Sequence, residues 1–196
     1  MITTTCKGRE AYKIGMAFGH MGQHEHEIVP FLAWVAERKP IYVCEIGVSH
    51  GALTRAFLEI APVVIGVDDP TGDGGLGEDF ARARDAELGR VAGARYVPVP
   101  FPSLDTRALE CFQFELDVLF IDGDHRGDAP LKDYEAYLPL MAPNGVIAFH
   151  DINSADHPGV GRHFDSVRYR HPRSFTISAG LSWGGIGVIL LGEGAA

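Results

Sequence analysis

Five short apolar runs, separated by amphipathic stretches, are the feature of this sequence that most constrains its fold. The runs are IYVCEIG (41–47), VVIGVDD (63–69), ARYVPVP (94–100), DVLFIDG (117–123) and GVIAFHD (145–151). They are continuously apolar instead of alternating, which is typical of strands buried on both faces. The segments between them have helical spacing and cover 52–60, 78–91, 103–112 and 129–141. This order predicts a mostly parallel sheet with helices on both faces.

The last part of the chain follows a different pattern. A helix is predicted at 161–170, and it is followed by strands at 173–180 and 183–191. Only Leu181 and Ser182 separate these strands, which is too short for a parallel crossover, so they must pair antiparallel. The predicted fold class is α/β: a Rossmann-like, seven-stranded, mostly parallel sheet that ends in a C-terminal antiparallel hairpin.

We expect a single domain over residues 1–196. Residues 1–40 form a helical prelude or lid, with one helix over 27–39, and residues 41–191 form the core. The length fits one domain with an apolar core large enough to need no disulfides.

Charge and cysteine content narrow the partners and the compartment. The formal net charge is −9, which argues against nucleic acid because phosphate binding needs clustered Lys and Arg. Three cysteines without metal spacing are typical of reduced thiols in the cytoplasm. No apolar stretch approaches the ~20 residues that span a membrane. We therefore expect a cytoplasmic protein with a small-molecule partner.

The turn after the first strand indicates the kind of ligand. Its sequence, CEIGVSHGALTRAF, places Glu45, Gly47 and Gly51 in the pattern E-x-G-x-x-x-G, with no Lys or Arg to meet a pyrophosphate. An acidic turn favours a cationic ligand. Asp68, at the end of the second strand, is placed to hold a ribose diol. S-adenosylmethionine (SAM) fits both features, and the alternative is an ordinary tight turn with surface acids.

Polar residues also follow the fourth and fifth strands. The set consists of Asp122, Asp124, His125, His150 and Asp151. Parallel sheets bind ligands at the carboxyl ends of their strands, so these side chains are expected to converge on one rim beside the cofactor. The alternative is that they form turns and helix caps.

The motifs E-x-G-x-x-x-G and VIGVDD resemble the first and second motifs of class I SAM-dependent methyltransferases, and the resemblance extends over 38–191. It implies that Asp68 binds the ribose hydroxyls and that Ser103 lies near the adenine. Asp122 is expected to border the cofactor as well. The residues implied at the methionine end are Glu45, Gly47, Ser49 and Gly51.

The pair IDGDH and PLMAPNGVIAFHD resembles small O-methyltransferases that act on sugar or phenolic hydroxyls, some of them metal-dependent. The resemblance implies Asp122 and Asp151 as metal ligands, with His150 where the metal-binding members often have another acid. Oxygen ligands suit Mg²⁺, whereas an imidazole favours Mn²⁺, Fe²⁺ or Zn²⁺. Asn153 is an alternative third ligand. Dimers are common among similar proteins, so a homodimer is possible.

The chemistry that follows is proton removal from a hydroxyl, with His125 or Asp124 as the acceptor. The leading hypothesis is a SAM-dependent methyltransferase acting on a small-molecule hydroxyl, with a divalent cation optional and nitrogen acceptors open. One alternative is a metal-dependent hydrolase or hydroxylase-like enzyme, and another is a noncatalytic SAM-binding partner. Arg126 either meets an acidic substrate or faces water.

Two further segments stand out, one rich in glycine and one rich in histidine. The glycine-rich loop at 71–79 lacks basic residues and is predicted to be a flap beside the ribose acid. His20, His24 and His26 are consistent with a separate metal site, a solvated helix start or a lid over the substrate.

Overall fold

The structure is a computed structural model that describes residues 2–72, 74–178, 180 and 183–192. The strands are β1 (Tyr42–Ile46), β2 (Val63–Val67), β3 (Arg95–Val99), β4 (Leu116–Ile121), β5 (Met141–Phe149), β6 (Ser174–Ile177) and β7 (Ile186–Leu190). The helices are α1 (Ile2–Phe18), α2 (Glu25–Arg38), α3 (Ala52–Phe57), α4 (Glu78–Leu88), α5 (Thr106–Leu109), α6 (Ala129–Tyr137) and α7 (Pro158–Arg168), with a 3₁₀ turn, η1 (Leu138–Leu140), after α6.

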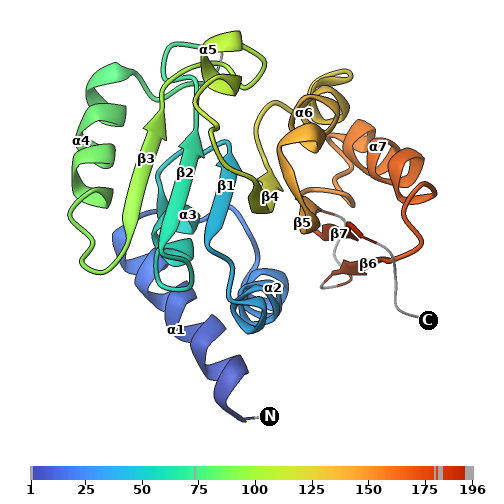
Figure 1. The fold of residues 1–196 in the computed structure, drawn as a ribbon, viewed down its shortest axis with the longest axis horizontal. Coiled ribbons are helices and arrows are strands. Elements are labelled where there is room, and N and C mark those ends of the chain that lie inside the picture. Colours follow the sequence, from blue (N-terminus) through green and yellow to red (C-terminus); the bar gives the residue numbers. More distant parts are fainter. Residues whose placement is uncertain (1, 73, 179, 181–182, 193–196) are drawn as a thin grey trace.

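The strands form one sheet in the order β3-β2-β1-β4-β5-β7-β6 (Figure 1). Strand β7 runs antiparallel to both of its neighbours, β5 and β6, and the remaining strand pairs are parallel. The predicted fold class is therefore confirmed. Because parallel strands share a direction, the carboxyl ends of β1, β2 and β4 lie along one edge of the sheet.

Both faces of the sheet are buried, which explains the continuous apolar runs. Val118 and Phe120 of β4 pack on the side of α1, α2 and α3, whereas Leu119 and Ile121 pack on the side of α6 and α7. Successive residues of a strand point to opposite faces, so each layer takes every second side chain.

Helix α1 was not predicted, because only one helix was expected before residue 41. Its two glycines lower helix propensity, yet they allow close packing. A Cβ atom on Gly8 would lie 2.6 Å from the carbonyl oxygen of Val29, and one on Gly15 would lie 2.4 Å from that of Ala52. The glycines therefore hold α1 close against α2 and α3.

Several predicted boundaries were wrong. The helix expected over 129–141 ends at Tyr137, and the strand expected over 145–151 begins at Met141 and ends at Phe149. The helix expected over 103–112 reduces to α5, which begins after Asp105, whose side chain accepts a hydrogen bond from the Arg107 amide. The last strand begins at Ile186 rather than residue 183, because Gly184 and Gly185 both have positive φ. Leu181 and Ser182, the predicted connection of the two last strands, lie outside the described residues. Among the described helices, none combines the length and apolarity needed to cross a bilayer.

Candidate functional site

The register of the sheet places the predicted polar residues in one row. Ile46 of β1 pairs with Ile121 of β4, and Ile121 pairs with Phe149 of β5. The next residue on each strand continues the ladder: the Asp122 amide donates to the Ile46 carbonyl at 2.9 Å, and the His150 amide donates to the Ile121 carbonyl at 3.0 Å. Sheet geometry, rather than loop structure, thus brings Asp122 and His150 together.

A cavity of about 580 Å³ opens along this edge of the sheet, within the size range of small-molecule sites. Of the predicted site residues, those that line it are Gly47, Ser49, Asp68, Ser103, Asp122, Asp124 and His125. Those that do not line it are Glu45, Gly51, His150 and Asp151. The first group is therefore available for ligand contact in this cavity.

The turn after β1 requires glycine at position 47, because a side chain there would collide with the end of β4. Gly47 has φ of 92°, and a Cβ atom there would lie 2.2 Å from the carbonyl oxygen of Asp122. Ser49, with φ of 49°, also adopts the left-handed region. This part of the turn therefore lies directly against the end of β4 and forms the floor of the cavity.

Glu45 departs from its predicted place. It lies on the same face of β1 as Val43, is only 2% exposed, and accepts a hydrogen bond from the Thr54 hydroxyl of α3. Burial raises the pKa of Glu45 well above its ordinary range, and the carboxylates of Asp122 and Asp68 act in the same direction. Glu45 therefore joins β1 to α3 and does not supply the exposed negative charge expected of this turn.

Asp68 lies on the cavity and is held by a buried arginine. Nη1 of Arg84 lies 2.6 Å from Oδ2 of Asp68 and 2.6 Å from the carbonyl oxygen of Ser49. The same guanidinium contacts Asp85 through Nε at 2.9 Å. Arg84 thus ties the loops after β1 and β2 together at the cavity wall, a role that sequence reasoning missed.

Ser103 lines the opposite part of the cavity and donates its hydroxyl to Asp133 of α6. Oγ of Ser103 lies 2.6 Å from Oδ1 of Asp133, and the Ser103 carbonyl accepts the Tyr137 hydroxyl at 3.0 Å. Asp133 lines the same cavity and was also missed. Its spacing from Pro130 and Tyr137, both buried, places it on the inner face of α6 and is the signal that could have found it.

His150 is buried and fully engaged with carboxylates. Its Nε2 lies 2.9 Å from Oε1 of Glu27, and its Nδ1 lies 3.1 Å from Oδ1 of Asp122. Glu27, which is 0% exposed, also accepts the Gly185 amide at 2.6 Å. Both ring nitrogens of His150 are therefore engaged with carboxylates, an arrangement that the predicted metal-ligand role did not include.

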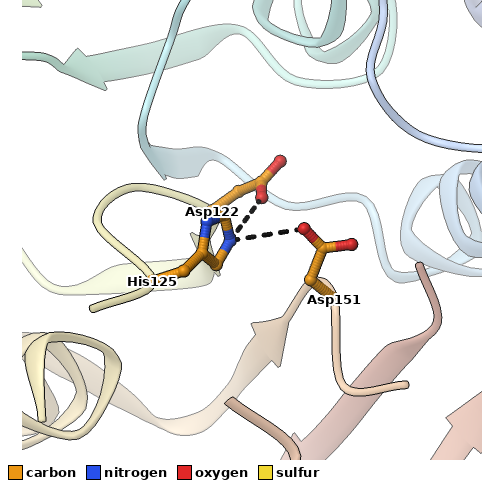
Figure 2. Close-up of side chains that lie close together, drawn as sticks. All are labelled: Asp122, His125 and Asp151. Atoms are coloured by element: carbon orange, nitrogen blue, oxygen red, sulfur yellow. Dashed lines mark ion pairs between the residues drawn. The ribbon is translucent and has the colours of Figure 1, made fainter. Parts of the chain in front are cut away.

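One cluster of side chains could hold a cation, and it consists of Asp122, His125 and Asp151 (Figure 2). It is the only cluster of this kind among the described residues. Nε2 of His125 lies 3.3 Å from Oδ1 of Asp122 and 3.5 Å from Oδ2 of Asp151. This nitrogen is buried without a well-aligned hydrogen bond. Asp151 has φ of 61°, a left-handed conformation that orients its carboxylate toward the ring.

The carboxylates and imidazoles at this edge of the sheet shift one another's pKa values. Burial alone would lower the pKa of His150, but Asp122, Glu27 and Asp151 raise it to about 10. Burial would raise the pKa of Asp122, but His150 and His125 lower it to about 2. The pKa of His125 is raised by Asp122 and Asp151 against the opposing effect of burial. A positive charge in this rim, on imidazole or on a ligand, is therefore stabilised.

Asp124 is less suited to proton transfer than expected. Its carboxylate pairs with the Arg126 guanidinium, with Nε 2.8 Å from Oδ1, and this pairing lowers its pKa. His157, which sequence reasoning missed, stacks on His125 with ring centroids 5.0 Å apart. Of the two predicted proton acceptors, only His125 keeps a nitrogen without a well-aligned hydrogen bond, and it is therefore the better candidate.

The N-terminal histidines do not converge. The His20 ring lies beside His50, the His24 ring lies against Trp183, and His26 is exposed. The neighbouring Gln23 donates its amide to Asp122. The start of α2 therefore reaches the site through Gln23 and Glu27, which the histidine pattern did not indicate.

Comparison with solved structures shows the fold. An O-methyltransferase from Bacillus cereus in complex with S-adenosylhomocysteine (SAH) aligns at 17% identity and a TM-score of 0.61, over 94% of this chain and 90% of that one. The O-methyltransferase TomG from Streptomyces achromogenes in complex with SAM aligns at 16% identity and 0.61, over 97% and 90%. The N-methyltransferase NodS from Bradyrhizobium japonicum aligns at 10% identity and 0.60, over 84% and 94%.

A search of curated protein sequences found no match to the chain. A family profile described as a methyltransferase domain matches residues 44–152, more than half of the chain. This segment runs from β1 to just beyond β5 and holds most of the cavity wall. It assigns the chain to methyltransferases rather than to metal hydrolases, so the predicted resemblance is confirmed: the chain belongs to the methyltransferase-domain family.

Proposed function

We propose that this methyltransferase moves the methyl group of SAM to a hydroxyl oxygen of a small molecule. The observation that supports this best is His125, a partly buried imidazole at the cavity wall, whose Nε2 lies between two carboxylates without a well-aligned hydrogen bond. The O-methyltransferases among the structural neighbours support the choice of oxygen.

The cofactor position follows from the cavity wall. The methionine end is proposed to lie on the turn at Gly47 and Ser49, and the ribose hydroxyls next to Asp68. Arg84 occupies one oxygen of Asp68, which leaves the other as an acceptor. The adenine then lies toward Ser103. The negative rim suits the sulfonium charge, as the sequence argument proposed, although Asp122 and Asp68 supply it rather than Glu45.

The reaction needs one bond to form and one to break. The acceptor oxygen attacks the methyl carbon, the S–CH₃ bond breaks, and SAH leaves as a neutral sulfide. The hydroxyl proton passes to His125, and the resulting imidazolium is stabilised by Asp122 and Asp151. Alignment of oxygen with methyl contributes much of the rate, on the order of 7–11 kcal/mol.

The same three side chains fit a divalent cation, because an orphaned buried nitrogen faces two carboxylates. Asp122, His125 and Asp151 would hold it, and two oxygens with one imidazole suit Mn²⁺, Fe²⁺ or Zn²⁺ better than Mg²⁺. When bound, the cation would lower the pKa of an adjacent hydroxyl. Metal analysis before and after chelation tests this.

The first experiment tests the cofactor. Isothermal titration with SAM, SAH and NAD should show binding of the first two only, because the glycine turn has no basic residue for a pyrophosphate. A chain that binds NAD and not SAM would overturn the proposal.

The second experiment tests the chemistry. A screen of hydroxylated metabolites, read out as SAH release, should identify an acceptor. His125→Ala should then lower kcat at least 100-fold with little change in SAM affinity, while His26→Ala, at an exposed position, should change neither. Full turnover in His125→Ala would remove His125 from the mechanism. Amine acceptors in the same screen test nitrogen methylation.

Other expectations remain predictions. The net charge of −9 supports a small molecule rather than nucleic acid as partner. Three free cysteines support a reducing, cytoplasmic setting. A homodimer is testable by light scattering.

A further inference from the structure

A second cavity lies at the opposite edge of the sheet from the first cavity, the one beside Asp122 and His125. Its volume is about 440 Å³, within the size range of small-molecule sites. Its walls come from the end of α2, the start of β4, the middle of β5 and the end of β7. Because Val118 lines it and Asp122 lines the first cavity, about 13 Å of β4 separates the two.

The two cavities differ in charge. The first is lined by five aspartates and one arginine. The second is lined by two arginines, Arg38 and Arg173, and by one acid, Asp117. Oδ2 of Asp117 already accepts the amides of Ile41 and Tyr42, at 2.7 and 2.9 Å. Two positive charges and one negative charge leave this lining at +1, on a chain whose net charge is −9. Anions are therefore attracted to the second cavity and repelled by the first.

The two arginines of the second cavity lack carboxylate partners. Among the described residues, no carboxylate oxygen lies within ion-pair distance of either guanidinium. Arg38 instead donates Nη1 to the Trp34 carbonyl at 2.9 Å, and its guanidinium lies 3.3 Å from the centre of the Trp34 ring, which fixes its orientation. Partial burial lowers the pKa of Arg38, Glu37 opposes this effect, and Arg173 adds to it. An anion between the two guanidinium groups would relieve their repulsion.

The rest of the cavity wall is aliphatic. The apolar lining residues, which include no aromatic ring, are Pro40, Val118, Val146, Leu190 and Leu191. Val118 and Val146 are only 1% and 2% exposed, so they form the floor. An aliphatic chain placed on this wall would lose its contact with water, which favours binding. The cavity thus combines a cationic rim with an aliphatic floor.

We propose that this second cavity binds a small aliphatic carboxylate, with its head between Arg38 and Arg173 and its chain against Val118 and Val146. A guanidinium presents paired N–H donors that match the two oxygens of a carboxylate. A lining charge of +1 suits a single negative charge better than the double charge of a phosphate monoester. The inference is independent of the proposed function, because the two cavities share no lining residue.

Isothermal titration with hexanoate tests the site, with hexanamide as the neutral match and acetate as the short one. Wild-type protein should bind hexanoate at least about tenfold more tightly than either, because hexanamide lacks the charge and acetate lacks the buried methylene groups. Arg173→Gln and Arg38→Gln should each weaken hexanoate at least about tenfold and leave hexanamide unchanged. Arg170→Gln, at an exposed position outside both cavities, is the matched control and should leave hexanoate affinity unchanged.

Each result bears on the inference. Arg38 and Arg173 are exposed, so both variants should unfold at the same urea concentration as wild type. Saturating SAH should not displace hexanoate, and displacement would place hexanoate in the first cavity and overturn the inference. Equal affinity for hexanoate and acetate would show that the arginines attract any anion without a built site. Unchanged hexanoate affinity in Arg173→Gln, or no hexanoate binding at millimolar concentration, would also show that the inference is wrong.

Discussion

Nε2 of His150 lies 2.9 Å from Oε1 of Glu27, although 123 residues separate the two in the chain. One residue belongs to the end of β5 and the other to α2, and both are almost fully buried. The contact joins α2 to the row of polar residues at the carboxyl ends of β4 and β5. Because Nδ1 of the same ring faces Asp122, a change at Glu27 is transmitted to the cavity wall.

Glu27→Ala should strongly destabilise the fold. It leaves the Gly185 amide and the His150 ring without their acceptor in a buried place, and breaking such a pair typically costs about 3–5 kcal/mol. Glu25→Ala, in the exposed first turn of the same helix, should stay within about 0.5 kcal/mol. Urea unfolding measures both, and a loss below about 1 kcal/mol for Glu27→Ala would contradict the burial argument.

Gly47→Ala should be far more damaging than Gly74→Ala. Both glycines have φ of 92°, so both substitutions carry a left-handed penalty of about 1–2 kcal/mol. Only at Gly47 does the added Cβ meet backbone, 2.2 Å from the Asp122 carbonyl oxygen, whereas Gly74 has nothing within 4 Å. The expected difference exceeds about 2 kcal/mol. Thermal and urea unfolding of the two variants measure this difference. Equal losses of stability would show that the left-handed backbone conformation alone accounts for the destabilisation.

The stability contribution of His150 should depend on pH with a defined sign. Its pKa is about 10 in the folded protein, against an ordinary value of 6.5. Its pairing therefore stabilises the fold fully below pH 6.5, and the contribution is lost as the pH rises toward 10. The unfolding free-energy difference between wild type and His150→Gln should shrink between pH 6.5 and pH 10.

The matched control for His150 is His26→Gln, at an exposed position of α2, which should change the unfolding free energy by less than about 0.5 kcal/mol. A His150→Gln difference that does not vary with pH would show that the ring is neutral in the folded protein.

Arg84→Met should weaken the cofactor site and the fold together. It removes the donor shared by Asp68 and the Ser49 carbonyl, and it leaves the Asp68 carboxylate without its counter-ion. We expect at least a tenfold loss of SAM affinity by titration and a loss of about 3 kcal/mol in unfolding free energy. Arg82→Met is the matched control, since Arg82 is exposed on the same helix, and this substitution should leave SAM affinity and the unfolding free energy nearly unchanged. Unchanged SAM affinity in Arg84→Met would show that Asp68 needs no positioning.

The sequence predicted what depends on strand order. Continuous apolar runs indicated a sheet buried on both faces, and parallel strands then placed Asp122 and His150 at one edge. It did not predict contacts between distant charges. Glu27 reads as one more acid in an amphipathic helix, although its spacing from the buried Phe31 places it on the inner face. Because Glu27 was missed, the sequence suggested His150 as a metal ligand and did not indicate that both of its ring nitrogens are hydrogen-bonded.

Strand β7 has a consequence for biogenesis. It lies between β5 and β6, so the edge of β5 stays without a partner until residues 186–190 have left the ribosome. Gly185, immediately before this strand, is also the amide donor to Glu27. Completion of the sheet and the joining of Gly185 to Glu27 are therefore one late event. A nascent chain that lacks this strand exposes the hydrogen-bonding edge of β5, which can pair with another strand.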